Sequence, residues 1–129
     1  MCRQRLANMV VSLIRRTNLG DDIGGFLLKV WHFNAPWILV INAAVLPRVG
    51  ALISLFTMTV ALGLYLVLGG CFLSDAENKL GVGDLNVVDP YIRLFGQTID
   101  AQTRYDFTVF GAYFAYVLVL SILHLRGII

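Results

Sequence analysis

The stretch VGALISLFTMTVALGLYLVLGGCFLS, residues 49–74, runs for 26 residues without a charge. A transmembrane helix needs about 20 apolar residues to cross a hydrocarbon core of roughly 30 Å. This stretch is therefore long enough to span a bilayer with some tilt. It ends in Gly69-Gly70-Cys71, and acidic residues follow at Asp75 and Glu77. The stretch predicts that lipid, rather than water, surrounds most of this fold.

The composition of the whole chain agrees with that prediction. Of 129 residues, 58% are hydrophobic and only 14% are charged, which is more apolar than a typical soluble domain. Two further charge-free stretches cover residues 30–47 and 107–125. A soluble helical domain is the alternative, but its helices normally show a charged face. We predict one all-α membrane domain over residues 1–129, with transmembrane spans near 35–47, 49–72 and 107–125.

Residues 1–33 form an amphipathic or interfacial segment in this prediction. A helix is expected over residues 4–17, and Asn18 and Gly20 are expected to stop it. Its apolar face carries Leu6, Met9, Val10 and Leu13, and its polar face carries Arg5, Asn8, Ser12, Arg15 and Arg16. Such a helix either lies in the headgroup plane or packs on a partner protein.

Several residues indicate where helices begin and where the chain turns after residue 33. Asn34 and Pro36 predict a new helix start, which leaves residues 20–33 either interfacial or part of the first span. Pro47 and Arg48 predict a tight turn that makes the first two spans an antiparallel hairpin.

The loop over residues 74–106 is predicted to hold two short helices. Ser74 and Glu77 have the spacing of a capping box. Asp89 is expected to cap a second short helix that has Pro90 at its first position. Thr98 or Asp100 would begin the last helix, with Asp100 and Arg104 paired one turn apart.

The distribution of basic residues predicts an orientation. With three spans, eight Lys and Arg residues lie on the side of the N-terminus and the 74–106 loop, and only Arg48 and Arg126 lie on the other side. This asymmetry places the N-terminus on the cytosolic or equivalent side and the C-terminus across the membrane.

The predicted spans carry little that suggests chemistry. No ionisable residue lies in the middle of a span, which argues against a proton relay or an ion-coupled transporter. His32 and His124 are read as interfacial side chains on opposite sides, so they are not expected to share a metal or haem. Asp75 and Glu77 could join Asp84 or Asp89 in a carboxylate site, but the capping roles are favoured. We expect no enzyme activity, metal, cofactor or small-molecule substrate.

Nucleic acid is also excluded as a partner, because no basic cluster is interleaved with aromatic residues. The two cysteines, Cys2 and Cys71, lack the spacing of a metal site. They are either S-acylation points or, in the alternative, an incidental residue at position 2 and a small buried one at position 71.

Small residues four positions apart let helices approach closely, either inside one chain or between subunits. Two such pairs are Gly50 with Ser54, and Gly111 with Ala115. The candidate structural and interaction residues are Gly70, Cys71, Ser74, Glu77, Asp89, Pro90, Gly111 and Ala115.

The pattern Gly70-Cys71-Phe72-Leu73-Ser74-x-x-Glu77-x-x-Leu80 resembles one in small, largely uncharacterised multi-span membrane proteins. There, a hairpin of two spans ends in Gly-Cys-x-Leu-(Ser/Thr), and Glu follows three residues later. The segment Val87-Val88-Asp89-Pro90-Tyr91 is similar to members encoded by large icosahedral DNA viruses. The resemblance covers residues 34–95. It implies a polytopic membrane protein, such as one in the membrane beneath a capsid, and carries over no catalytic residue.

These observations favour a structural or assembly subunit of a membrane-containing complex, whose partners are the bilayer and other protein subunits. One variant is a virion inner-membrane or minor capsid protein, and another is an accessory subunit of an organellar respiratory complex. Two other hypotheses stay open. A small oligomeric pore or carrier would use Asn42, Ser54, Thr57 and Ser121. A lipid-modifying or redox enzyme would use Cys71 and Glu77.

Overall fold

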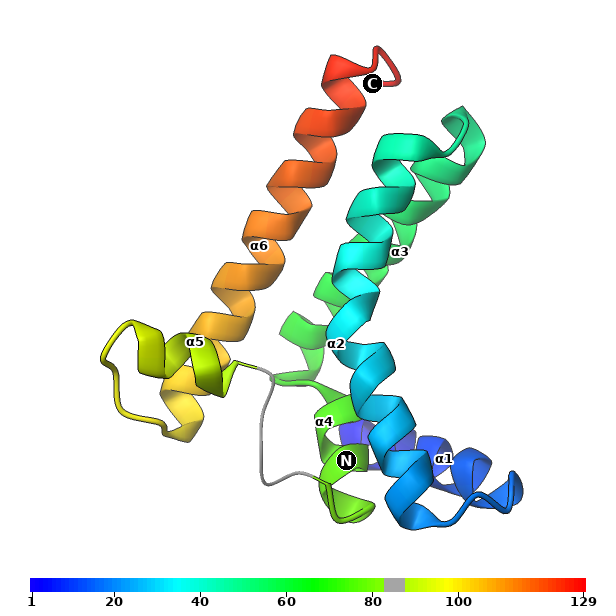
Figure 1. The fold of residues 1–129 in the computed structure, drawn as a ribbon, viewed down its shortest axis with the longest axis vertical. Coiled ribbons are helices and arrows are strands. Elements are labelled where there is room, and N and C mark those ends of the chain that lie inside the picture. The colour runs from blue at the N-terminus through cyan, green and yellow to red at the C-terminus, as the bar shows by residue number, and fades with distance from the viewer. Residues whose placement is uncertain (83–87) are drawn as a thin grey trace.

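The computed structural model describes residues 1–82 and 88–129, which form helices and no strand in those ranges (Figure 1). The helices are α1 (Cys2–Arg16), α2 (Asp21–Val45), α3 (Arg48–Leu68), α4 (Phe72–Lys79), α5 (Asp89–Leu94) and α6 (Ala101–Leu125). The expected all-α fold is thus confirmed. Figure 1 shows the three long helices along the long axis, with the N-terminus near one end and the C-terminus at the other.

Helices α2, α3 and α6 form a bundle around a narrow core. The hairpin turn at Pro47 and Arg48 is as predicted, since α2 ends at Val45 and α3 begins at Arg48. The buried core side chains are mostly small: Val40, Ala43, Ala51, Met58, Ala115, Val119 and Leu123. Arg126, just after α6, links that helix to the end of α2. Its guanidinium donates to the carbonyl oxygens of Ala43 (2.5 Å) and Leu46 (2.8 Å). Those carbonyls lie at the C-terminal end of α2, where a cation is favourable.

Helix α2 is continuous, so the predicted helix start at Asn34 is wrong. The side chain of Asn34 donates to the carbonyl of Val30 inside the helix (2.7 Å) instead of capping a new one. Pro36 lies within the helix. A proline there has no N–H for the carbonyl four residues earlier, which belongs to His32. Packing along the rest of α2 outweighs this local loss.

In the described part of the chain, two helices are long and apolar enough to cross a membrane: α3 and α6. They correspond to the predicted spans at 49–72 and 107–125. Little of either helix is buried within the protein. The exposed side chains include Phe56 and Val67 of α3 and Phe110 and Phe114 of α6. Helix α2, which contains the predicted span 35–47, is not one of these two helices. Lys29 and His32 in its first half lower its mean hydropathy.

A pair of glycines turns the chain at the end of α3. Gly69 has φ 64° and Gly70 has φ 151°, and both values favour glycine. The N–H of Gly70 returns to the carbonyl of Tyr65 (3.0 Å), which closes α3. Helix α4 then starts at Phe72 and packs against α1 and α2. The capping box at Ser74 is therefore wrong, because Ser74 lies inside α4 and Cys71 occupies the N-cap position.

Helix α1 packs within the chain through a face that overlaps the predicted apolar face only in part, at Val10. Its buried residues are Ala7 and Val11, which contact Ala76 and Leu80 of α4 and its C-terminal end. Met9 and Leu13 of the predicted apolar face stay more than half exposed. The predicted stop is confirmed, since Asn18 and Gly20 have positive φ values.

Helix α5 is attached to the start of α6. Asp89 is the first residue of α5 rather than its cap, and Pro90 lies in the first turn as predicted. Asp89 pairs with Arg104 of α6, so the predicted Asp100–Arg104 pair is wrong. Asp100 instead caps α6 by accepting from the backbone N–H of Thr103 (2.7 Å).

Candidate functional site: a cysteine, a histidine and a glutamate at the end of the hairpin

Side chains from three parts of the chain meet where α3 turns into α4. The ring of His32, on α2, lies between Glu77 of α4 and Cys71 just before α4. Its Nδ1 donates to Oε1 of Glu77 (2.8 Å), and its Nε2 lies 3.4 Å from Sγ of Cys71. Glu77 is buried, with 4% of its surface exposed, while His32 and Cys71 are half-buried. We refer to these three residues as the thiol cluster.

The thiol cluster favours a charged pair of thiolate and imidazolium. Burial lowers the pKa of His32, but hydrogen bonds to Cys71 and Glu77 outweigh it and raise that pKa well above 6.5. Burial likewise raises the pKa of Cys71, and the hydrogen bond and charge of His32 outweigh it and lower that pKa below 9.0. The backbone N–H groups of Ser74 and Leu73, in the first turn of α4, lower it further.

The geometry suits nucleophilic chemistry better than metal binding. Glu77 and Cys71 meet opposite nitrogens of one ring, so a single metal ion could not be bound by all three side chains. Over residues 1–82 and 88–129, no group of three or more His, Cys, Asp and Glu residues is arranged to hold a metal. A nucleophile beside a base, with the base oriented by a third group, is the arrangement of covalent catalysis.

Charged side chains of α1 and α2 make contacts beside the thiol cluster. Arg3 pairs with Asp75 (2.6 Å) and donates to the carbonyl of Gly69 (3.1 Å), two residues before Cys71. Gly70 is buried against the Arg3 guanidinium, and a side chain at Gly70 would collide with it. Lys29, on α2, donates to the carbonyl of Val82 (2.5 Å). These contacts hold α1, α2 and the two ends of α4 together beside Cys71.

The remaining predicted site residues lie elsewhere. Asp75 pairs with Arg3 and Asp89 with Arg104, so neither joins Glu77 in a carboxylate site. Asp84 lies outside the described residues, as do Gly83 and Val87. Ala115 is buried in the bundle core, whereas an added side-chain carbon at Gly111 would meet nothing within 4 Å.

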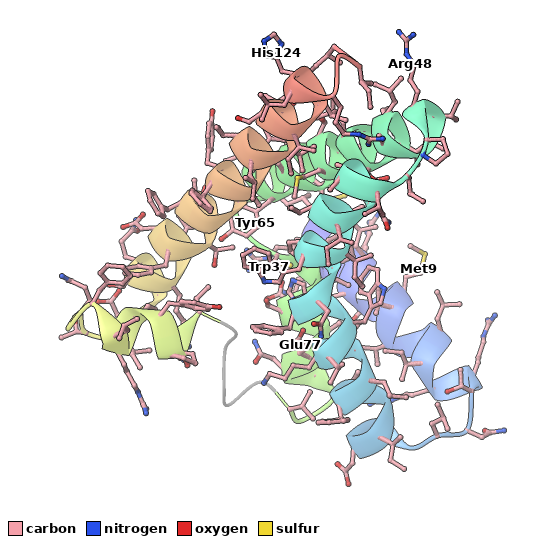
Figure 2. All side chains as sticks on the ribbon, turned by 45° about the horizontal axis from the view of Figure 1, so that its top comes forward. Met9, Trp37, Arg48, Tyr65, Glu77 and His124 are labelled. Atoms are coloured by element: carbon pink, nitrogen blue, oxygen red, sulfur yellow. The ribbon has the colours of Figure 1, made fainter. Side chains whose placement is uncertain are left out.

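The polar residues of the long helices do not gather around a lumen. Ser54 is buried and donates to the carbonyl of Gly50 (3.1 Å). Thr57 and Ser121 are exposed and donate to carbonyls of their own helices. His124 lies toward the end of the molecule away from Glu77, which contacts His32, so the two histidines are far apart, as predicted (Figure 2).

No protein-family model, curated protein or solved structure matches this chain.

Proposed function

We propose that this chain is a membrane protein that uses Cys71, at the membrane surface, as a nucleophile in group transfer. The observation that supports it is the position of His32, whose two ring nitrogens meet the Cys71 sulfur and the buried Glu77 carboxylate. In this role, Cys71 attacks an electrophilic donor, His32 holds and returns the proton, and Glu77 orients the ring. The sequence pattern alone does not favour catalysis, because the predicted spans carry few polar groups and His32 is separated along the chain from Cys71 and Glu77.

The pH dependence of thiol alkylation tests this proposal. With Cys2 replaced by serine, the alkylation rate of Cys71 is expected to reach half of its maximum below pH 9.0, the ordinary thiol value. The reason is that a lowered pKa makes the reactive thiolate available at lower pH. Iodoacetamide labelling followed by mass spectrometry measures the rate. A midpoint at or above 9.0 would refute an activated thiol.

The proposal includes insertion in a bilayer by three crossings. Helices α3 and α6 supply two of them, and the second half of α2, beyond Pro36, would supply the third. The exposed apolar side chains of all three helices and the opposite positions of the two chain ends support this arrangement. The thiol cluster would then lie on the basic, cytosolic-equivalent side of the membrane.

The accessibility of the chain ends tests the number of crossings. A chain whose one cysteine is Cys2 and a chain whose one cysteine replaces Ile129 are expected to react with a membrane-impermeant maleimide from opposite faces of sealed vesicles. Labelling of both from one face would mean an even number of crossings.

A second candidate function is that of a structural or assembly subunit in a membrane-containing complex. The face of α6 that carries Phe110, Gly111 and Phe114 supports it. Both phenylalanines are largely exposed, at 73% and 59%, and Gly111 has open space above it. Aromatic residues beside an open glycine suit the close approach of another apolar helix.

A pair of glycine substitutions tests this second candidate. Gly111→Leu is expected to weaken self-association or subunit association in mild detergent by about 10-fold, because the added side chain blocks close helix approach. Gly63→Leu is the matched control, since Gly63 of α3 also has open space above it. Equal association of both variants and the natural chain would count against the α6 face.

A further inference from the structure

The position of the thiol cluster at the end of α3 limits the kinds of donor molecule with which Cys71 could react. Cys71 follows the last residue of α3, Leu68, by only three positions. The last turns of α3 expose Leu64, Leu66 and Val67. If α3 crosses the bilayer, these side chains lie at the edge of the hydrocarbon. A lipid-like molecule lying along α3 would therefore present its polar end at the depth of the thiol.

Charge around the same corner favours an anionic head on that molecule. Arg3 borders Gly70, and Arg5 is exposed on the same helix. Helix α1, which packs against α4, carries four arginines and no acidic residue. Two of them pair with acids of other segments, Arg3 with Asp75 and Arg15 with Asp21, while Arg5 and Arg16 are exposed. A phosphorylated head group is attracted to such a surface.

The chemistry of a thiolate indicates which functional group of the donor it attacks. Exchange between a thiolate and a thioester needs no oxidant, reductant or metal, since one C–S bond forms and one breaks.

We propose that Cys71 accepts a long-chain acyl group from an acyl thioester with a phosphorylated head, such as an acyl-coenzyme A, at the membrane surface. The Cys71 sulfur bonds to the acyl carbonyl carbon, and the donor's C–S bond breaks. The departing thiolate takes the proton that His32 received from Cys71. The products are S-acylated Cys71 and the free thiol of the donor. This inference rests on the proposed function, because it needs the nucleophile described there.

The full chain in vesicles of phosphatidylcholine and phosphatidylglycerol, with Cys2→Ser, is incubated with palmitoyl-coenzyme A or acetyl-coenzyme A. Intact mass spectrometry is expected to show one hydroxylamine-sensitive palmitoyl group, absent from Cys71→Ser. Palmitoyl transfer should exceed acetyl transfer at least about 10-fold, because only the long chain is concentrated in the bilayer beside α3. His32→Gln should slow palmitoyl transfer by about 10-fold or more.

The outcomes separate the two proposals. Equal rates with both thioesters, or no acylation while Cys71 keeps its lowered alkylation midpoint, would overturn the acyl donor and leave the nucleophile standing. Loss of both acylation and the lowered midpoint would overturn both. Palmitoyl transfer at an unchanged rate in His32→Gln and in the conservative Glu77→Gln would mean that membrane proximity alone acylates the thiol, and would also overturn the inference.

Discussion

Replacing His32 by glutamine is expected to slow the alkylation of Cys71 at pH 7 by at least about 10-fold. The imidazolium holds the pKa of Cys71 below 9.0 against burial, which acts in the opposite direction. Without it, burial dominates and the midpoint of the pH profile moves up to 9.0 or beyond. A thiol with an ordinary pKa is only a few per cent ionised at pH 7. The measurement is the iodoacetamide rate from pH 5 to 10 in a Cys2→Ser chain.

His124→Gln is the matched control, because His124 is exposed at the opposite end of the molecule (Figure 2). It should leave the Cys71 profile unchanged. Glu77→Gln should produce a smaller slowing than His32→Gln, since a neutral amide still accepts the hydrogen bond from Nδ1 but stabilises the imidazolium less. An identical profile in the natural chain and in His32→Gln would end the idea that the ring activates the thiol.

The thiol cluster could not be predicted from the sequence, although each member was visible in it. Cys71 and Glu77 were singled out together, but His32 is separated from them by 39 and 45 positions. A straight hairpin pairs residues equally distant from the turn, which would place His32 beside Ala61. The contact arises because Gly69 and Gly70 turn the chain, so that α4 packs against α2 and α1. Such a turn depends on tertiary packing, which local patterns do not encode.

Local patterns predicted the fold where one local interaction dominates. The turn at Pro47, the stop at Asn18 and the Asp100 cap are as expected, because each depends on residues a few positions apart. The errors arose where a distant contact competes with a local one. Ser74 and Glu77 have the spacing of a capping box, but the carboxylate of Glu77 accepts a hydrogen bond from His32 instead. Arg104 could pair with Asp100, but it contacts the more buried Asp89.

Replacing Arg104 by leucine is expected to lower the free energy of unfolding by about 2 kcal/mol. Its guanidinium donates two hydrogen bonds to Asp89, both 2.8 Å, and Asp89 is only 4% exposed. Removing one partner of a fully buried pair costs about 3–5 kcal/mol, because a charge is left in an apolar place. The effect should be smaller here, since about a third of the Arg104 side chain reaches solvent, at 34%. Denaturant unfolding in detergent micelles, followed by circular dichroism, measures the loss.

Two further variants make this result specific to the paired geometry. Arg93→Leu removes an exposed arginine of α5 and should change the stability by less than about 0.5 kcal/mol. Arg104→Lys keeps the charge but loses the two-pronged contact, so it should lie between the natural chain and Arg104→Leu. If Arg104→Leu and Arg93→Leu were equally mild, the pair would not hold α5 to α6. A loss of stability in Arg104→Leu but not in Arg93→Leu would show that the contact between Arg104 and Asp89 holds α5 against α6.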